Sequence, residues 1–527
     1  MKASRRLGRS GPSLGWLLVA LLAFSSCGDV TYFADLGAGG GGGAAVGPVT
    51  GFGSVKIGGA VFSTDNATIA DDQGRSIDNV IEGMVLTVRG TLDQDFKAGS
   101  AATVAIEREV RGPVDDDGVA LDNNTIRVLG QAVLVNPATV MVRSGGGEFG
   151  LGDLKTDVDN NALHPELEVH GWRDGQGLLH AAYIGRGRDN VVADETVWIR
   201  GTVGGFDALM RTFLIGEQKV DFTGLPAAGR VNWPLTGLAD GMIVDVRGRL
   251  DAVGGGGILR TDRTGDRIEG ITVSLGKSGD RVTLDGYVLS GTVSSFGLSA
   301  PGGSITVNGG AGATGDVFAV RKRVRVKGAV SGSAGTTVQS TSIAVLSPNE
   351  VLLEGSPSAI SPSGGTLTLL GKTVEVDDFT LFRDGTGTVR KDFGLSSLST
   401  LHTVRVVGFF DGTVSPGKIV ATKLERLSMA PASTVTAQGA LSASAFPTYT
   451  ILDLPGIVVS TGLKPNTDYF LKGGVPTDAA TFFQDISIGT VVRVKRGIFS
   501  DGPPRIAEPD PGSSSGRMEV EIVQGNN

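Results

Sequence analysis

Apolar and polar residues alternate in short runs along the chain, and one such run returns several times. Its two clearest copies are Glu82–Asp93 (EGMVLTVRGTLD) and Asp240–Asp251 (DGMIVDVRGRLD). Looser copies occupy Pro165–Gly171, Lys322–Gly328, His402–Gly408 and Thr490–Gly497. Alternation with a period of two is typical of a strand with one face in a core and the other in water. Six copies at this spacing predict a repeat protein built from short strands.

The residues around each copy follow a common order. An opening strand such as Ile199–Val203 precedes a hairpin such as Thr366–Val376, and a polar excursion, the core strand and a closing strand follow. The glycine after each core strand permits a bulge, which helps a small sheet to close. No segment has a helical period with caps. We therefore predict an all-β fold of six small barrels in series, each burying its valines in a core of its own.

This order of elements resembles the bacterial family of domain of unknown function 5666. Members of that family carry OB-like β-barrel units of this size, often in tandem on predicted envelope proteins. The resemblance covers nearly all of Gly51–Val523. Its motifs are glycines and alternating valines, so it implies tandem OB-like barrels and offers no catalytic residue to carry over.

The repeats set the predicted boundaries of the chain. Residues 1–26 are expected to form a signal peptide, and residues 27–50 a lipidated cysteine with a Gly-rich tether. The expected barrel units are 51–109, 110–195, 196–287, 288–350, 351–433 and 434–527. Residues 270–285 are an irregular addition to the third unit. The glycine run 39–43 favours a flexible spacer at the end of the tether.

The N-terminus has the pattern of an exported protein. Lys2 and three arginines precede the apolar run Leu14–Phe24, which has the length of a signal-peptide core and is too short for a comfortable membrane span. Ser25, Ser26 and Cys27 follow, and this resembles a bacterial lipoprotein signal, although Phe24 stands where that motif prefers Leu, Val or Ile. The resemblance implies lipidation of Cys27 and sorting to the outer membrane. The alternative is an ordinary secretory signal that contains a cysteine.

Composition narrows the classes of protein. The chain has 527 residues, too many for one core, and its 82 glycines indicate many turns. The net charge of -8 argues against a nucleic-acid binder, which usually presents a basic face. Cys27 is the single cysteine, so no disulfide forms within the chain. We expect no cofactor.

One segment has the spacing of a calcium loop. Asp157, Asp159 and Asn161 occupy loop positions one, three and five, and Glu168 occupies position twelve. Ala162, however, stands where such a loop needs glycine. A second reading places a divalent metal between His164 and His170, near the two aspartates. The alternative is that both histidines are exposed, with His170 sharing an outward face with Glu168.

Other chemistry is sparse in the sequence. It contains no Gly-x-Ser-x-Gly elbow, no phosphate-binding Gly-Lys-Ser/Thr loop and no His-Glu-x-x-His motif, so we expect no enzyme activity. Arg323, Arg325 and Lys327 share one face of a strand, which we interpret as a solvated face that discourages edge association. Three tryptophans offer platforms for a glycan or pack in cores and edges: Trp172, Trp198 and Trp233.

The resulting hypothesis is a lipid-anchored cell-envelope protein with a structural, scaffolding or protein-binding role. It reaches the membrane through its N-terminal lipid, on the periplasmic or cell-surface face of the outer membrane. Its expected partners are other envelope proteins or glycans, and not nucleic acid. The rival hypotheses are a lipoprotein that binds a glycan or small ligand on one barrel face, and an enzyme, which needs a deep pocket with converging polar groups.

Overall fold

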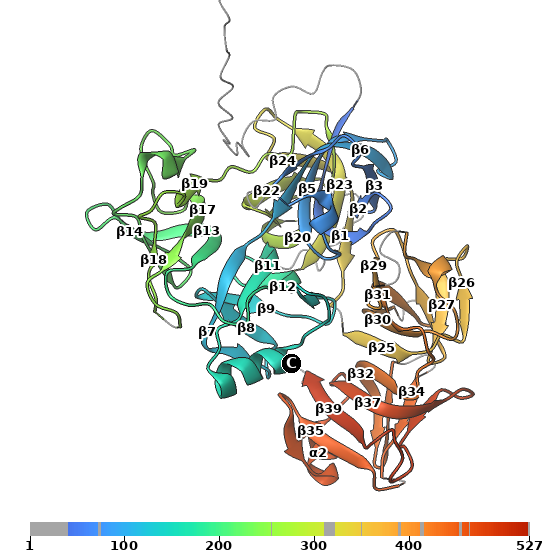
Figure 1. Ribbon diagram of the computed structural model, residues 1–527. Helices are drawn as coiled ribbons and strands as arrows, with labels where there is room; N and C mark the ends of the chain where they lie inside the picture. The colour runs from blue at the N-terminus through green and yellow to red at the C-terminus, as the bar shows by residue number, and fades with distance from the viewer. Residues whose placement is uncertain are drawn as a thin grey trace, which may run out of the picture.

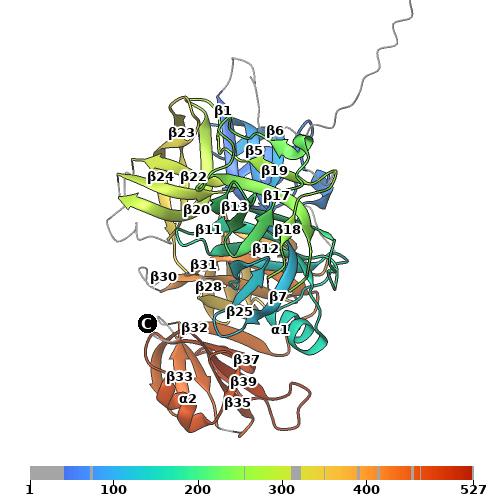
Figure 2. The same ribbon diagram turned by 90° about the vertical axis from the view of Figure 1, so that its left-hand side faces the viewer.

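The computed structural model of the chain is almost entirely β-structure (Figures 1 and 2). It describes residues 41–524 apart from 72–74, 255, 293, 310–321, 349, 388–391, 412–415, 453–455 and 463. The expected signal peptide and Cys27 lie outside the described residues. The strands form three large sheets, and each sheet contains two consecutive or distant copies of one connectivity. We call these six strand sets units 1–6.

Unit 2 shows the connectivity clearly. Its first strand, β7 (Val110–Ala120), pairs with β8 (Thr125–Val128), and β8 pairs with β9 (Gln131–Leu134). The closing strand, β12 (Leu179–Arg186), lies parallel to β9 and antiparallel to the core strand β11 (Glu166–Arg173). Because β11 returns to β7, the five strands form a closed ring. The all-β prediction of small closed barrels is confirmed.

The first sheet joins unit 1 to unit 4. Its strands are β1 (Gly42–Gly51), β2 (Val55–Ile57), β3 (Ala60–Ser63), β4 (Thr68–Ala70), β5 (Val85–Leu92), β6 (Ala98–Glu107), β20 (Arg281–Thr292), β21 (Ser295–Ala300), β22 (Gly303–Asn308), β23 (Arg323–Ser331) and β24 (Thr337–Leu346). The two first strands, β1 and β20, lie parallel, with Val46 opposite Leu284. Units far apart in the sequence are therefore side by side, as the blue and yellow strands of Figure 1 show.

The second sheet joins units 2 and 3 through their first strands, β7 and β13. In addition to the strands of unit 2 it contains β10 (Val140–Arg143), β13 (Thr196–Asp207), β14 (Thr212–Ile215), β15 (Gln218–Asp221), β16 (Arg230–Val231), β17 (Ile243–Leu250), β18 (Leu259–Arg260) and β19 (Arg267–Gly270). Trp198 of β13 lies opposite Arg111 of β7.

The third sheet joins units 5 and 6 through β25 and β32. Unit 5 contains β25 (Val351–Gly355), β26 (Ala359–Ser361), β27 (Thr366–Leu369), β28 (Lys372–Glu375), β29 (Leu381–Asp384), β30 (Thr403–Asp411) and β31 (Lys418–Ser428). Unit 6 contains β32 (Val435–Ala445), β33 (Thr448–Ile451), β34 (Ile457–Ser460), β35 (Thr467–Leu471), β36 (Val475–Thr477), β37 (Val491–Ser500), β38 (Arg505–Ala507) and β39 (Met518–Gln524).

The repeated glycine after the core strand has a local cause. The ladder between core and closing strands shifts register at Gly90, Gly171, Gly328 and Gly408, which confirms the predicted bulge. At each of these positions a Cβ atom would collide with a carbonyl oxygen of the closing strand. Only glycine lets the two backbones approach so closely.

In two of the three sheets the apolar core is shared by both units, whereas units 1 and 4 of the first sheet have separate clusters. One cluster of buried side chains contains Val110 of unit 2 together with Val246 of unit 3, and another contains Val351 of unit 5 together with Val494 of unit 6. The prediction of a separate core for each unit is therefore wrong for these two pairs. Because neighbouring units share sheets and cores, the division into six independent domains stays a prediction.

The tether prediction is wrong for its last residues, because β1 begins at Gly42. Ala44 and Ala45 are fully buried, and β1 pairs with β2, β5 and β20. A Cβ atom on Gly43 would collide with Leu92. Glycine and alanine are needed here because two units press against one strand, and small residues at such a place look the same in a sequence as a flexible spacer.

Two other expectations about the chain's elements need correction. The irregular addition predicted after unit 3 contains the start of β20, so unit 4 begins at Arg281 and not at 288. Helices are also present, although they are short: α1 (Leu151–Lys155), α2 (Ala479–Asp485) and single turns at Ile77–Asn79, Thr156–Asn160, Ala227–Gly229 and Leu395–Ser397. One or two turns are too few to show a period of 3.6 residues. In the described part of the chain, no helix is long and apolar enough to cross a membrane.

Candidate functional site at the junction of the units

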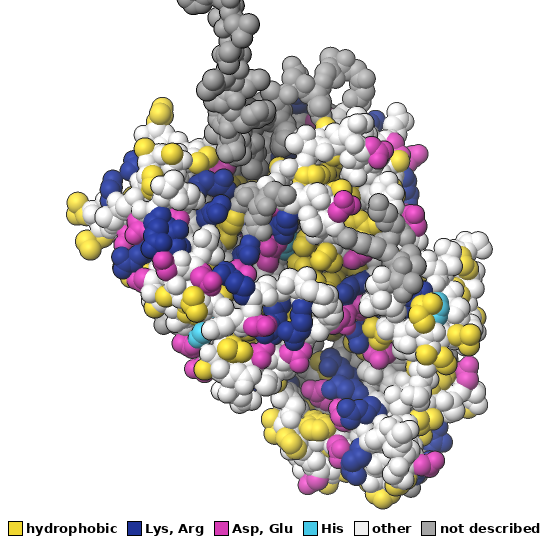
Figure 3. All heavy atoms as spheres, in the orientation of Figure 1, with side chains coloured by type: hydrophobic (Ala, Val, Ile, Leu, Met, Phe, Trp, Pro, Cys, Tyr) yellow, Lys and Arg dark blue, Asp and Glu magenta, His cyan; other side chains and the backbone are white. Residues whose placement is uncertain are grey.

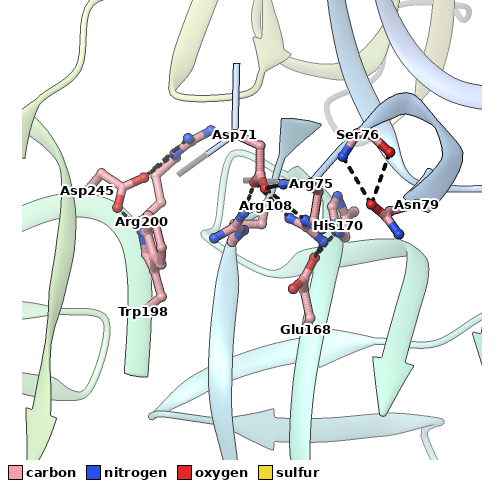
Figure 4. Close-up of polar contacts among 10 residues, drawn as sticks. All are labelled: Asp71, Arg75, Ser76, Asn79, Arg108, Glu168, His170, Trp198, Arg200 and Asp245. Atoms are coloured by element: carbon pink, nitrogen blue, oxygen red, sulfur yellow. Dashed lines mark hydrogen bonds and ion pairs between the residues drawn. The ribbon is translucent and has the colours of Figure 1, made fainter. Parts of the chain in front are cut away.

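A network of buried ion pairs lies where units 1, 2 and 3 meet (Figure 4). Its centre is Arg108, between the last strand of unit 1 and the first strand of unit 2, with 3% of its side chain exposed. The Arg108 guanidinium contacts Asp71 Oδ1 at 2.5 Å, and its Cζ lies 4.3 Å from the centre of the Trp198 ring. One arginine thus contacts a carboxylate of unit 1 and an aromatic face of unit 3.

The network continues from Asp71 into unit 2. Arg75 donates to Asp71 Oδ2 at 3.1 Å and to Glu168 Oε1 at 2.7 Å. The same Glu168 oxygen lies 2.8 Å from His170 Nε2, two residues further along β11. His170 is fully buried, and its ring meets the Tyr183 ring edge-on at 5.3 Å. The alternation of β11 places Glu168 and His170 on one face, as predicted, but this face is covered by unit 1.

The charges of this group follow from its surroundings. Burial alone raises the pKa of Glu168, but the hydrogen bond with His170 and the charges of Arg108 and Arg75 outweigh it and lower the pKa. Burial lowers the pKa of His170, and Glu168 offsets only part of this effect. At neutral pH Glu168 is therefore an anion and His170 is neutral.

A second group in the network surrounds Arg200 of β13. Its guanidinium donates to Glu107 Oε2 at 2.8 Å and to Asp245 Oδ2 at 3.2 Å. Trp198 Nε1 donates to the other oxygen of Asp245. Although burial works against the charged form, Glu107, Asp245 and Glu109 together raise the pKa of Arg200. The positive charge of Arg200 therefore stabilises the three buried carboxylates of Glu107, Asp245 and Glu109.

A polar cleft of about 330 Å³ borders this group, between units 2, 3 and 4. Glu109, Arg173 and Arg200 line it, together with glycines and serines of the β21–β22 turn. Arg173 donates to Glu109 Oε2 at 3.2 Å. Burial raises the pKa of Glu109, and Arg173 and Arg200 offset this only in part. The cleft thus offers a small polar molecule two guanidinium groups, the carboxylate of Asp174 and the Glu109 carboxyl, which protonates more readily than usual.

The residues of the predicted calcium loop do not come together. Asp157 lies 2.6 Å from an Arg186 nitrogen, and Asp159 lies 2.6 Å from Lys155 Nζ. Asn161 donates to Asp157 at 3.3 Å, whereas Glu168 belongs to the network described above. The loop prediction is wrong because residues 156–160 form a helical turn and Glu168 lies inside β11. Among the described residues, no group of three or more His, Cys, Asp or Glu side chains could hold a metal ion.

The two histidines proposed as metal ligands also diverge. His164 Nδ1 lies 3.2 Å from the Val114 carbonyl oxygen, and His164 Nε2 lies 3.7 Å from Asp116. His170 faces Glu168 and Tyr183, away from that loop. The expectation that His170 is exposed is wrong as well, because unit 1 covers its face of β11.

The basic strand of unit 4 is not a solvated face, which corrects another prediction. Arg323 and Arg325 are 19% and 12% exposed and share the carboxylate of Asp285. The Arg323 guanidinium lies 5.0 Å from the centre of the Trp172 ring, and that of Arg325 lies 4.1 Å from the centre of the Phe379 ring. These arginines join unit 4 to units 2 and 5.

A second buried cluster joins unit 2 to unit 5. Glu425 of β31 is fully buried and lies 2.9 Å from an Arg383 nitrogen and 3.1 Å from Lys423 Nζ. Glu148 of unit 2 reaches the same Arg383 at 2.6 Å. Both glutamates also lie within ion-pair distance of Arg405, at 3.5 Å for Glu148 and 3.6 Å for Glu425. The polar outer faces of several barrels are thus interfaces between units.

One feature of the sequence, a run of consecutive charges, is related to these ion-pair networks. The run Glu107-Arg108-Glu109 places three consecutive charges at the end of β6 and in the link to β7, and β23 carries a charge at every second position from Arg323 to Lys327. Such a pattern fits a solvated face and a covered face equally well. Only knowledge of which units are neighbours separates the two.

The geometry defines a class of protein: a chain of small β-barrels that share sheets and are joined by buried ion pairs. The model of a domain of unknown function (DUF5666) matches residues 111–185 and 354–425. The two matched regions lie in units 2 and 5, so these two units are similar to this domain. No curated protein matches the chain.

Proposed function

We propose that the protein is a lipid-anchored component of the bacterial cell envelope with a structural and protein-binding role. Support comes from the way the units are joined. Shared sheets and buried pairs such as Asp71–Arg108 and Arg383–Glu425 hold the described units in one arrangement. A chain built in this way presents its loops at fixed positions, as a scaffold requires (Figures 1 and 2).

An exposed apolar tip on unit 3 carries the protein-binding part of the proposal. Leu209 and Met210, in the turn between β13 and β14, are 95% and 67% exposed. Arg211 of the same turn donates a hydrogen bond to the Thr223 carbonyl oxygen, which ties the turn to the segment after β15. Two adjacent apolar side chains held in water in this way are typical of protein interaction sites. Over the rest of the face in Figure 3, basic and acidic side chains are interspersed with further hydrophobic groups.

Affinity purification from detergent-solubilised envelopes tests this role. The tagged full chain is expected to recover a defined assembly. Serine at both Leu209 and Met210 is expected to lower the recovery of that assembly at least tenfold, because a partner would lose the apolar contact. Melting temperature should change little, since both side chains are already in water. Quantitative mass spectrometry of the eluates gives the measurement.

Val475→Ser is the matched control for the double variant. Val475 is 54% exposed but lies on unit 6, far along the chain from the tip. It should recover the assembly as the wild type does. Equal recovery with the double variant would remove the tip from the proposal, and recovery of lipid and glycan alone would transfer the support to the glycan-binding alternative.

The membrane anchor is a separate part of the proposal and is supported by the sequence around Cys27. Cys27→Ser is expected to abolish incorporation of radiolabelled palmitate and to move the protein from the membrane to the soluble fraction, because lipid attachment needs the thiol. Ser26→Ala keeps a small residue before the cysteine and should keep the label. Unchanged labelling of Cys27→Ser would contradict the anchor.

Glycan binding and catalysis have less support. Trp172 and Trp198 are 3% and 5% exposed, and Trp233 is partly buried against unit 3, so these side chains pack and do not present open rings. The acids with shifted pKa values in the junction are engaged in ion pairs. We therefore propose a non-enzymatic protein, with protein partners in the envelope and no nucleic acid.

A further inference from the structure

A small cavity lies where all three sheets meet. Its wall includes Pro48 and Arg325 from the first sheet, Trp172 and His180 from the second, and Phe379 from the loop of unit 5 that precedes β29. No strand pairing joins the three sheets among the described residues, so the side chains that line this cavity contribute to holding them together.

The wall of the cavity is rich in cations and hydrogen-bond donors. Two guanidinium groups, an indole, a phenol and an imidazole line it, from Arg323, Arg325, Trp172, Tyr287 and His180. No carboxylate is among the lining side chains in the described part of the chain. The other two clefts differ, because Glu107 lines one and Glu109 lines the other.

The hydrogen bonds behind the wall leave one of the two arginines only partly satisfied. Asp285 accepts two hydrogen bonds from Arg323, at 2.7 and 2.8 Å. Arg325 Nε lies 3.5 Å from the same carboxylate, which is too long for a well-formed hydrogen bond. Burial and the neighbouring Arg323 lower the pKa of Arg325, because together they outweigh Asp285 and Asp377, which favour its charged form. A buried cation without a full partner is costly unless an anion neutralises it.

Trp172 supplies a second donor. Its side chain is 97% buried, yet its Nε1–H has no acceptor in the described part of the chain. Buried indole N–H groups usually find a hydrogen-bond acceptor. The cavity that Trp172 lines has a volume of about 40 Å³. A single water needs roughly 10–15 Å³ by this measure, so the space suits a few atoms and excludes a sugar or a nucleotide.

We propose that this cavity binds one small monovalent anion, of the size of chloride or formate, which ties the three sheets together. The anion accepts hydrogen bonds from the Trp172 indole and from Arg325, and its charge balances the second guanidinium beside Asp285. Binding favours the arrangement in which units 1, 2, 4 and 5 meet, so the anion is a structural ligand of the folded chain.

Chloride itself is the probe. The full chain, purified in detergent, is dialysed against gluconate, which is too large for the cavity, and is then titrated with chloride at constant ionic strength. The melting temperature is expected to rise in a saturable way by about 3 °C by 100 mM chloride. Trp172→Phe keeps a ring and removes the donor, so it should lose at least half of this rise. Arg260→Gln, at an exposed pair, should keep it.

Crystals soaked in bromide give a second measurement that does not depend on any variant. An anomalous peak within hydrogen-bond distance of Trp172 Nε1 supports the proposal. Water alone in the cavity overturns it, as does a melting temperature that is indifferent to chloride or that responds equally in Trp172→Phe. Since neither measurement involves the membrane anchor or a protein partner, this outcome is independent of the proposed function.

Discussion

Replacing Arg200 with methionine is expected to lower the free energy of unfolding by about 3–5 kcal/mol, the usual cost of removing one partner of a buried ion pair. The Arg200 side chain is 11% exposed, and its removal leaves Glu107 and Asp245 without their nearest cation. Methionine fills a similar volume, so the loss reflects the stranded carboxylates and not a cavity. Urea unfolding followed by the fluorescence of Trp198 and Trp233 gives the measurement.

Two substitutions separate this effect from a general loss of charge. Arg260→Met removes an arginine of the same unit that pairs with Asp251 at 3.0 Å, but this pair is exposed at 47% and 30%. Because solvent screens this pair, its loss should change the free energy of unfolding far less than the loss of Arg200 does. Arg200→Lys keeps the charge but not the forked geometry, so an intermediate value is expected. Equal losses for Arg200→Met and Arg260→Met would show that the junction adds nothing to stability.

The barrels themselves could be predicted because their causes are local. Alternation of the kind seen in Val324 and Val326, with Gly328 after them, reports a strand, a buried face and a bulge, and each follows from the residue types in a short window. The glycine is needed by backbone approach within a single unit. The same reasoning therefore succeeded for the bulges at Gly90, Gly171, Gly328 and Gly408.

The arrangement of the barrels could not be predicted, because it depends on contacts between distant segments. Ala44 and Ala45 are small so that units 1 and 4 can pair through β1 and β20, yet their sequence context of glycines indicates a spacer. No pattern in either strand identifies the other as its partner. The pairing of unit 1 with unit 4 depends on the tertiary packing of all the units and not on the sequence of either strand alone.

The ion networks failed prediction for a related reason. Alternation shows that Glu168 and His170, or Arg323 and Arg325, leave the core of their own barrel, and water is the default environment for such a face. In the structure a neighbouring unit covers that face, and opposite charges from several units meet there, as Arg75 meets Glu168. The positions of the charged residues therefore predicted which strand face points out of its own barrel, but not that another unit covers this face.

Replacing Glu425 with glutamine is expected to cost about 3–5 kcal/mol at pH 7, because it strands Lys423, Arg383 and Arg405 around a buried neutral group. Burial alone raises the pKa of Glu425, but Lys423, the contact with Glu148 and the two arginines outweigh it and lower the pKa to about 2. The carboxylate therefore stabilises the fold above its unfolded value of 4.5 and loses this effect as the pH falls towards 2. The difference from wild type should shrink over the same range.

Glu148→Gln is the matched substitution in the same cluster and should behave oppositely. Burial and the neighbouring Glu425 raise the pKa of Glu148, so its carboxylate form opposes folding as the pH rises above 4.5, while its protonated form does not. Glutamine resembles that protonated form and keeps a polar contact to Arg383. Glu148 is 38% exposed, so water weakens the effect, and a change of less than about 1 kcal/mol at pH 7 is expected. Urea unfolding at pH 7 and pH 3.5 tests both variants, and similar losses for the two glutamates would contradict the assignment of Glu425 as the anion that joins units 2 and 5.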